Sequence, residues 1–372
     1  MKTQTNNFRA LLIMAAIGSY LLWSAGAAIP LIRLDLGISR TLAGVHNIAV
    51  GMGATLGARL TVPLIKKYGR VWITRIMLVL MFIGVIGLVT APSIWLSIPS
   101  VGLAAYSQTT VNAISLAQIS HDSAPSMRRM MLQTGAQAVV GATAILLISI
   151  SLHAGNGWRL PIILGAIILT PLSLISIWRV KFIDPEISAQ NTGAKFTRAL
   201  ELKLFTYGVV NSILEMGIGF WALDLLVSRN APVALGALGS SILSFAIATS
   251  RISLAFFDLG GLRTMRFASV SIVIGVLIIC SVEDPYFTMA GLAVAALGTA
   301  PLFGLGAFRV SEGFAHADFR ISRYMMGTAF SYGFAPFVLA IIFDNLGYVA
   351  GYALLLPVAG AGYLLWKING RE

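Results

Sequence analysis

One carboxylate is placed where it could carry a proton inside a membrane. Glu215 lies thirteen residues after Leu202, in the middle of an apolar segment, where an ionised side chain costs at least ~2.5 kcal/mol. Asn211 is one helical turn earlier on the same face, so both side chains would point the same way. We predict that the pair binds a proton or a solute; the alternative is a structural carboxyl hydrogen-bonded between helices. For Asp224, further along the segment, a packing role between helices is expected.

Two arginines also lie inside apolar segments. Arg59 and Arg251 are 192 residues apart, and each precedes a loop glycine, Gly69 and Gly261 respectively. A guanidinium offers donors in a fixed geometry that suits carboxylates and oxyanions, so two of them could grip an anion from both sides. The alternative is that both side chains extend to the nearer membrane surface.

Uncharged polar side chains recur at a spacing of four residues in three other segments. The pairs are Gln108 with Asn112, Tyr20 with Ser24, and Gln133 with Gln137. Each pair would share one helix face, which is typical of helices that line a hydrated cavity. Polar contacts between packed helices are the alternative, since Asn and Gln also join helices in membranes.

The sequence lacks the motifs of several other chemistries. The histidines (His46, His121, His153 and His316) are not spaced as metal ligands, and Cys280 is the only cysteine. There is no Walker P-loop, no His-Glu-x-x-His run and no Gly-x-Ser-x-Gly turn. We expect no metal, no cofactor and no enzymatic activity. A receptor or a membrane-embedded enzyme is the alternative of a different class.

Membrane-spanning helices must position these residues. The 372 residues are 57% hydrophobic and 11% charged, with a mean hydropathy of +0.86, which excludes a water-soluble protein. A span needs about 20 apolar residues, and we count twelve such segments. They are Ala10–Ile32, Leu42–Ile65, Trp72–Ala91, Ile94–Ile119, Met131–Leu152, Leu160–Trp178, Leu202–Val227, Val233–Phe257, Met265–Val282, Tyr286–Phe308, Tyr324–Phe343 and Tyr348–Trp366. We predict an all-α membrane protein with a six-helix bundle (1–180), a cytoplasmic linker (181–201) and a second six-helix bundle (202–372).

The basic residues indicate the orientation of the chain. A net charge of +12 would suggest a nucleic-acid partner in a soluble protein, but most of the 26 lysines and arginines gather at one set of helix ends and loops. This is the bias of cytoplasmic loops. We predict a multi-pass protein of the cell inner membrane with both termini in the cytoplasm and no nucleic-acid partner. The first segment also resembles a signal peptide, but it exceeds the usual ~7–15 apolar residues, so we predict a helix.

The two halves of the chain carry related residues. Five glycines recur 192 residues later, at the same offset as Arg59 and Arg251: Gly44 with Gly236, Gly69 with Gly261, Gly135 with Gly327, Gly141 with Gly333, and Gly155 with Gly347. Each half has an even number of spans, so the two repeats run parallel.

The loop after the second segment carries a family resemblance. Four residues match the Gly-x-Leu-Ala-Asp-Arg-x-Gly-Arg-Arg loop motif of the major facilitator superfamily: Leu64, Lys67, Gly69 and Arg70. With the 6+6 layout, the chain resembles this superfamily over its whole length. Val62 replaces the first glycine and Lys66 the acidic residue, whereas Asp258, three residues before Gly261, keeps an acidic residue in the second half. We expect these two loops to brace or gate the cytoplasmic side.

The resemblance implies two six-helix bundles around a central cavity that opens alternately to each side. In this superfamily the first, fourth, seventh and tenth helices line the cavity, which would place Tyr20, Gln108 and Glu215 there. The arginines of the second and eighth segments are similar to those of its nitrate and cyanate branches, without the glycine-rich nitrate signature. The fifth segment lacks the Gly-Pro signature of drug-exporting antiporters, which favours uptake.

These observations predict a secondary active transporter of the major facilitator superfamily. It would move a small solute across the lipid bilayer by alternating access, coupled to protons through Glu215, and work as a monomer. The two arginines favour an anionic solute. The alternative is a proton-driven efflux antiporter for drugs or metabolites, which would tolerate the loss of Arg59 and Arg251.

Overall fold

The computed structural model describes residues 2–121, 127–178, 180, 182, 197–257, 261–311 and 317–369. In this part of the chain the regular secondary structure is helical. The helices are α1 (Lys2–Leu36), α2 (Arg40–Tyr68), α3 (Arg70–Thr90), α4 (Ile94–His121), α5 (Met127–His153), α6 (Arg159–Ile177), α7 (Arg198–Gly219), α8 (Ala222–Ser228), α9 (Val233–Phe256), α10 (Gly261–Ser281), α11 (Pro285–Ser311), α12 (Ala317–Ala353) and α13 (Leu355–Asn369).

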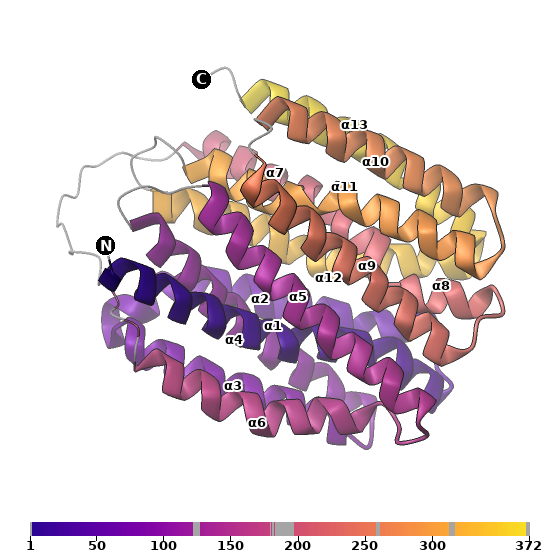
Figure 1. Cartoon of the computed structure of the whole chain (residues 1–372), viewed down its shortest axis with the longest axis horizontal. Helices are drawn as coiled ribbons and strands as arrows, with labels where there is room; N and C mark the ends of the chain where they lie inside the picture. Colours follow the sequence, from indigo (N-terminus) through magenta and orange to yellow (C-terminus); the bar gives the residue numbers. More distant parts are fainter. Residues whose placement is uncertain are drawn as a thin grey trace.

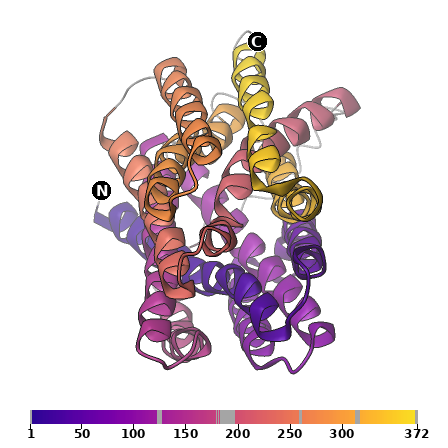
Figure 2. The same cartoon turned by 90° about the vertical axis from the view of Figure 1, so that its right-hand side faces the viewer.

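The helices form two bundles with the same internal pairing. In the first half α1 packs against α5 and α6, α3 against α4 and α6, and α2 against α4. In the second half the equivalent pairs are α7 with α12 and α13, α10 with α11 and α13, and α9 with α11. Helices α5 and α9 join the halves along one seam, and α2 and α12 along the other. The pairing in one half therefore repeats in the other, as the predicted parallel repeat requires (Figures 1 and 2).

The chain is a multi-pass membrane protein. Ten helical stretches of the described residues are long and apolar enough to cross a bilayer. The polar run Ser107–Thr110 lowers the hydropathy of α4, and α13 has only 15 residues. Gly347, with φ +81°, bends α12, so the residues after it and α13 together form the last of the twelve predicted segments. Helix α1 begins and α13 ends at the same end of the bundle (Figure 1); we call the opposite end the far end.

The seventh predicted segment is not one continuous helix. The sequence predicts a single span over Leu202–Val227, but α7 ends at Gly219 and α8 begins at Ala222. Trp221, in the break, is fully buried, and its indole N–H donates to the carbonyl oxygen of Pro336 at 2.8 Å. The indole of the break thus contacts α12. Broken helices occur in membrane proteins where they border a cavity.

Small residues let the halves approach closely. A Cβ atom at Gly51 of α2 would lie 2.7 Å from the Cα atom of Gly333 in α12. In the other seam, a Cβ atom at Gly135 of α5 would lie 2.8 Å from a side-chain carbon of Ile252 in α9. Gly135 and Gly333 both belong to the glycines of the 192-residue repeat. Close backbone contact at small residues is how helices associate in a membrane.

Candidate functional site

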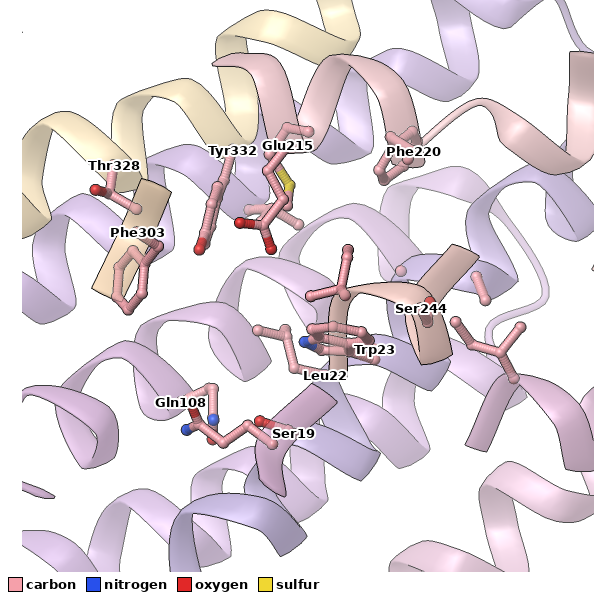
Figure 3. A pocket seen from close by; sticks show the side chains of 18 of the residues that line it. Ser19, Leu22, Trp23, Gln108, Glu215, Phe220, Ser244, Phe303, Thr328 and Tyr332 are labelled. Carbon is pink, nitrogen blue, oxygen red and sulfur yellow. The ribbon is translucent and has the colours of Figure 1, made fainter. Parts of the chain in front are cut away.

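A cavity of about 220 Å³ lies between the two halves. Helices α1, α2, α4 and α5 contribute its wall on one side, and α7, α9, α11 and α12 on the other, with α8 adding Leu223. In Figure 3 the carboxylate of Glu215 and the hydroxyl of Tyr332 point into this space, while Gln108 and Ser19 lie across from them. The cavity is therefore bordered by both six-helix bundles, as the resemblance implied.

The central feature of the wall is a buried ion pair. One terminal nitrogen of Arg251, Nη2, donates to both carboxylate oxygens of Glu215, at 2.8 and 2.9 Å. The two side chains are only 5% and 6% exposed. Buried charges are stable only when they are paired and hydrogen-bonded, and this pair meets both conditions.

Backbone carbonyls hold the guanidinium in place. Nε of Arg251 donates to the carbonyl of Ala300 in α11 at 2.8 Å, and Nη1 donates to that of Thr134 in α5 at 3.4 Å. The contact with Thr134 is possible because Gly135 brings α5 close to α9 at this level. Arg251 thus connects helices α5, α7, α9 and α11, which come from both halves of the chain.

Pro301 leaves one backbone carbonyl of α11 without its helical partner near this site. A proline lacks the N–H that would pair with the carbonyl four residues earlier, which is Leu297, and Ser250 donates to that carbonyl instead at 2.8 Å. On the other side of the proline, Asn211 donates to the carbonyl of Leu302. Polar side chains of α7 and α9 thus bond to α11 around its proline.

Amide side chains form the opposite wall. Asn112 accepts hydrogen bonds from Gln137 at 3.0 Å and from Gln133 at 3.3 Å, which connects α4 to α5. Gln108 fits against Gly18 of α1, where an added Cβ atom would lie 2.2 Å from the Gln108 Oε1 atom. That oxygen is buried without a hydrogen-bond partner among the described residues. The wall therefore holds both bonded and unsatisfied amide groups.

Four of the seven predicted binding residues line the cavity, and three do not. Glu215, Arg251, Gln108 and Asn112 form part of the lining. Asn211 lies a turn away from it, buried, with its amide directed at Leu302 and the hydroxyl of Tyr324.

The other two predicted residues, Tyr20 and Arg59, point elsewhere. The hydroxyl of Tyr20 donates to the carbonyl of Pro161 at 2.9 Å, and its ring packs on Gly165 of α6, because this long side chain reaches beyond its own helix face. Arg59 is exposed on α2 and is not part of the lining. Of the two predicted arginines, only Arg251 is among the described residues that line the cavity.

Several lining residues are not apparent from the sequence. Asn47 in α2 is fully buried, and neither atom of its amide group has a partner among the described residues. Asn47 is not part of a pair of polar residues four positions apart, so the spacing of polar residues does not reveal it. Trp23, for which packing is the ordinary interpretation, lines the cavity and packs on Gly141, where an added Cβ atom would lie 2.4 Å from its ring. The position of Gly141 in the repeat is the one sequence signal for this contact.

An ionic cluster joins the halves at the far end. Asp224 of α8, 1% exposed, accepts hydrogen bonds from Arg33 of α1, Arg40 of α2 and Tyr348 of α12. Arg40 also pairs with Asp344 of α12 at 3.2 Å. This cluster ties α1 and α2 to α8 and α12, so Asp224 lies between the bundles and outside the cavity lining. We call it the Asp224 cluster.

The predicted loop motif is visible in part. Gly69, with φ +80°, forms the turn between α2 and α3, and its N–H donates to the carbonyl of Ile65. Lys66 and Lys67 are exposed beside it, whereas Arg70 is buried and bonds to Gln118 of α4.

The second-half counterpart of this loop is only partly described. Gly261 begins α10 against the ring of Trp366, and Arg309 lies over the same ring. Asp258 lies outside the described residues. The predicted brace between the two loops is therefore not tested.

No histidine is among the described residues that line the cavity. His46 is buried in α2, between the carbonyl of Ala43 and the hydroxyl of Ser97. Within the described ranges, no three histidine, cysteine or acidic side chains are grouped so that they could hold a metal ion.

Comparison with known proteins identifies the fold. No protein-family profile matches the chain, and no curated protein is similar to it in sequence. Solved structures are similar over nearly the whole chain. A D-xylose-proton symporter aligns with a TM-score of 0.74 at 14% identity, covering 98% of this chain and 97% of that one. FucP, described as a major facilitator superfamily transporter in the outward conformation, aligns at 0.72 and 12% identity, with 98% and 99% covered. The chain has the major facilitator fold.

A third neighbour with this fold, the human organic anion transporter MFSD10, aligns at 0.73 and 14% identity, covering 97% of this chain and 98% of that one. The match confirms the predicted all-α 6+6 architecture. In the major facilitator fold of this chain, the Glu215–Arg251 pair joins the seventh and eighth spans, and the carbonyl of Thr134 belongs to the fifth. The pair therefore lies where the two halves face each other across the cavity.

Proposed function

We propose that the chain is a secondary active transporter that couples movement of a small solute to protons by alternating access of the central cavity. The observation that carries this proposal is the Glu215–Arg251 ion pair in the cavity wall. A buried carboxylate that faces a cavity between two bundles is the group best placed to bind a proton from either side.

The geometry links protonation of Glu215 to the packing of four helices. When Glu215 is ionised, Nη2 of Arg251 holds both of its oxygens, while Nε and Nη1 bind α11 and α5. Protonation removes the charge that makes this bond strong. The relative stability of two arrangements of the halves can then depend on the proton, which is the requirement for coupling.

Both seams support a rocking motion of the halves. They pair small residues, such as Gly51 with Gly333, and the α5–α9 seam includes hydrogen bonds from hydroxyls to backbone carbonyls, such as that from Ser241 to Ala142. The Asp224 cluster would have to separate for the far end to open, because it connects helices of both halves.

The proposal includes the predicted setting of the chain. Residues 1–180 and 202–372 move as two units, and residues 181–201 connect them in the cytoplasm. Both termini are cytoplasmic, the membrane is the cell inner membrane, and the working unit is a monomer in the lipid bilayer. The placement of lysines and arginines supports this orientation.

The size of the cavity supports a small solute. Its volume of about 220 Å³ is below the ~300–1,000 Å³ typical of pockets for drug-sized ligands. Proton-driven efflux of drugs or metabolites is the second candidate, and the aromatic residues Trp23, Phe220 and Phe303 in the wall favour it. Proton coupling through Glu215 is common to both candidates, whereas the direction of solute movement separates them.

Proton flux in proteoliposomes tests the proposal. Vesicles loaded with a pH-sensitive dye would be exposed to a panel of small neutral, anionic and cationic solutes, with wild type, Glu215→Gln and Arg59→Gln compared. We expect a solute-dependent proton signal in wild type and Arg59→Gln that is lost in Glu215→Gln. Solute movement that is equal with and without the Glu215 carboxyl would refute the proposed role.

A further inference from the structure

The cavity contains one positive and one negative group. Among the described residues that line it, Glu215 and Arg251 are the only ones that carry charge. The other polar groups of the wall are amides and hydroxyls, such as those of Asn47, Gln108 and Tyr332. The lining is thus neutral as long as Glu215 is ionised.

A proton on Glu215 would leave this lining with a net positive charge. Arg251 stays protonated at any physiological pH, and at 5% exposure it has almost no contact with water. Its bonds to the carbonyls of Ala300 and Thr134 would remain and keep the guanidinium at the wall. Nη2, however, makes both of its bonds to Glu215, so this nitrogen would lose its charged partner. An unpaired buried cation is strongly unfavourable, and an anion can remove that penalty.

We infer that the transported solute carries one negative charge, as a carboxylate or a similar oxyanion, and that it takes the place of the Glu215 carboxylate on Nη2 of Arg251. The inference rests on the proposed function and specifies its substrate class. One proton moves from water to a carboxylate oxygen of Glu215 for each anion that binds, so the loaded cavity is again neutral. Transport is then electroneutral, with one proton per monoanion.

The remaining wall fits the uncharged part of such a solute. Asn47 and Gln108 each carry buried amide atoms without a partner among the described residues, which could bond to hydroxyl or carbonyl groups. Trp23 and Phe220 offer apolar faces on the same cavity. We therefore expect a small monoanion that carries hydroxyl or carbonyl groups beside an apolar part.

A binding experiment with nitrate and formate tests the inference without knowledge of the natural solute. These small monoanions suit an arginine, and their apparent affinity would be measured from the thermal stabilisation of the purified full-length protein. Glu215→Gln presents Arg251 without its carboxylate at every pH, and Glu215→Gln/Arg251→Gln removes both charges with similar side-chain volume. Arg59→Gln serves as the control for the loss of a positive charge outside the cavity.

The expected results are specific for a bound anion that replaces the Glu215 carboxylate on Arg251. Glu215→Gln should bind nitrate or formate at least about tenfold more tightly than the double variant, independently of pH. Wild type should bind more tightly as the pH falls, by up to about tenfold per pH unit, since one proton accompanies each anion. Arg59→Gln should behave as wild type.

Two other results would overturn the inference. Equal affinity of Glu215→Gln and the double variant would show that Arg251 does not hold the anion. Wild-type affinity that does not change with pH would show that proton and anion are not exchanged together. Either result leaves the proposed function intact if the solute panel gives a proton signal that depends on Glu215. The clearest case would be such a signal with a neutral solute, accompanied by a change in membrane potential. A missing proton signal together with Glu215-independent solute movement refutes the proposed function itself.

Discussion

Replacement of Arg251 by glutamine should destabilise the protein in a way that depends on pH. The change removes two charge-assisted bonds to Glu215, at 2.8 and 2.9 Å, between side chains that are 5% and 6% exposed. Each such bond contributes about 1.5–3 kcal/mol, and breaking a buried pair by removing one partner costs about 3–5 kcal/mol. We expect a loss of that size in the free energy of unfolding at about pH 8, where a lone carboxylate is ionised in water.

The loss should shrink as the pH falls. Without the guanidinium, an ionised Glu215 is a buried charge without a partner, and a proton on the carboxyl removes this penalty, which exists only in the folded variant. Where the folded state binds more protons, stability rises as pH falls, and at about pH 5 we expect about half or less of the loss to remain. Glu215→Gln should show no such recovery, because an arginine cannot release its proton.

Chemical unfolding in mixed detergent micelles at the two pH values would measure these differences for wild type, both single variants and Glu215→Gln/Arg251→Gln. The double variant should regain most of the loss, because it leaves no unpaired charge. An Arg251→Gln loss that is the same at both pH values, or a double variant as unstable as the sum of the singles, would refute the reasoning.

Three further predictions concern other parts of the bundle. Asp224→Asn should leave Arg33 and Arg40 without their shared carboxylate and widen the far end. Spin labels at the exposed Leu36 and Leu346 would report this as a longer distance than in the protein with Asp224, both measured in a Cys280→Ser background. Gly333→Ala should separate α12 from α2, because an added Cβ atom would lie 2.6 Å from the carbonyl oxygen of Asn47, and should cost about 1–3 kcal/mol of unfolding free energy; a change within error would contradict the packing. Arg59→Gln should leave solute transport within about twofold of wild type, since the side chain is exposed outside the cavity.

Much of the architecture follows from hydropathy and charge. The twelve predicted segments correspond to the observed helices because a helix is the way to satisfy the backbone of a single span in lipid. The break between α7 and α8 could not be predicted in the same way. It depends on a hydrogen bond from Trp221 to the carbonyl of Pro336, 115 residues away, and no local pattern encodes that contact.

A residue of the site could be predicted where its type is energetically costly inside a membrane. It could not be predicted where the direction of the side chain decides whether it reaches the cavity. A charge in mid-span is expensive wherever it points, so Glu215 and Arg251 could be selected from the sequence alone. Their mutual contact depends on how α7 and α9 both pack against α11. Asn211 shares the helix face of Glu215, yet α11 covers it at the level of Leu302. Tyr20 likewise reaches α6, because its ring packs on Gly165 and its hydroxyl bonds to Pro161.

The central claim is that proton and solute bind together through Glu215 and Arg251, and the proton count on binding tests it most directly. Nitrate would be added to the purified full-length protein in weakly buffered detergent solution, and proton uptake would be read with a pH indicator. We predict uptake of about one proton per nitrate bound in wild type and Arg59→Gln, and none in Glu215→Gln although that variant binds nitrate. Nitrate binding to wild type through Arg251 without proton uptake would contradict the account.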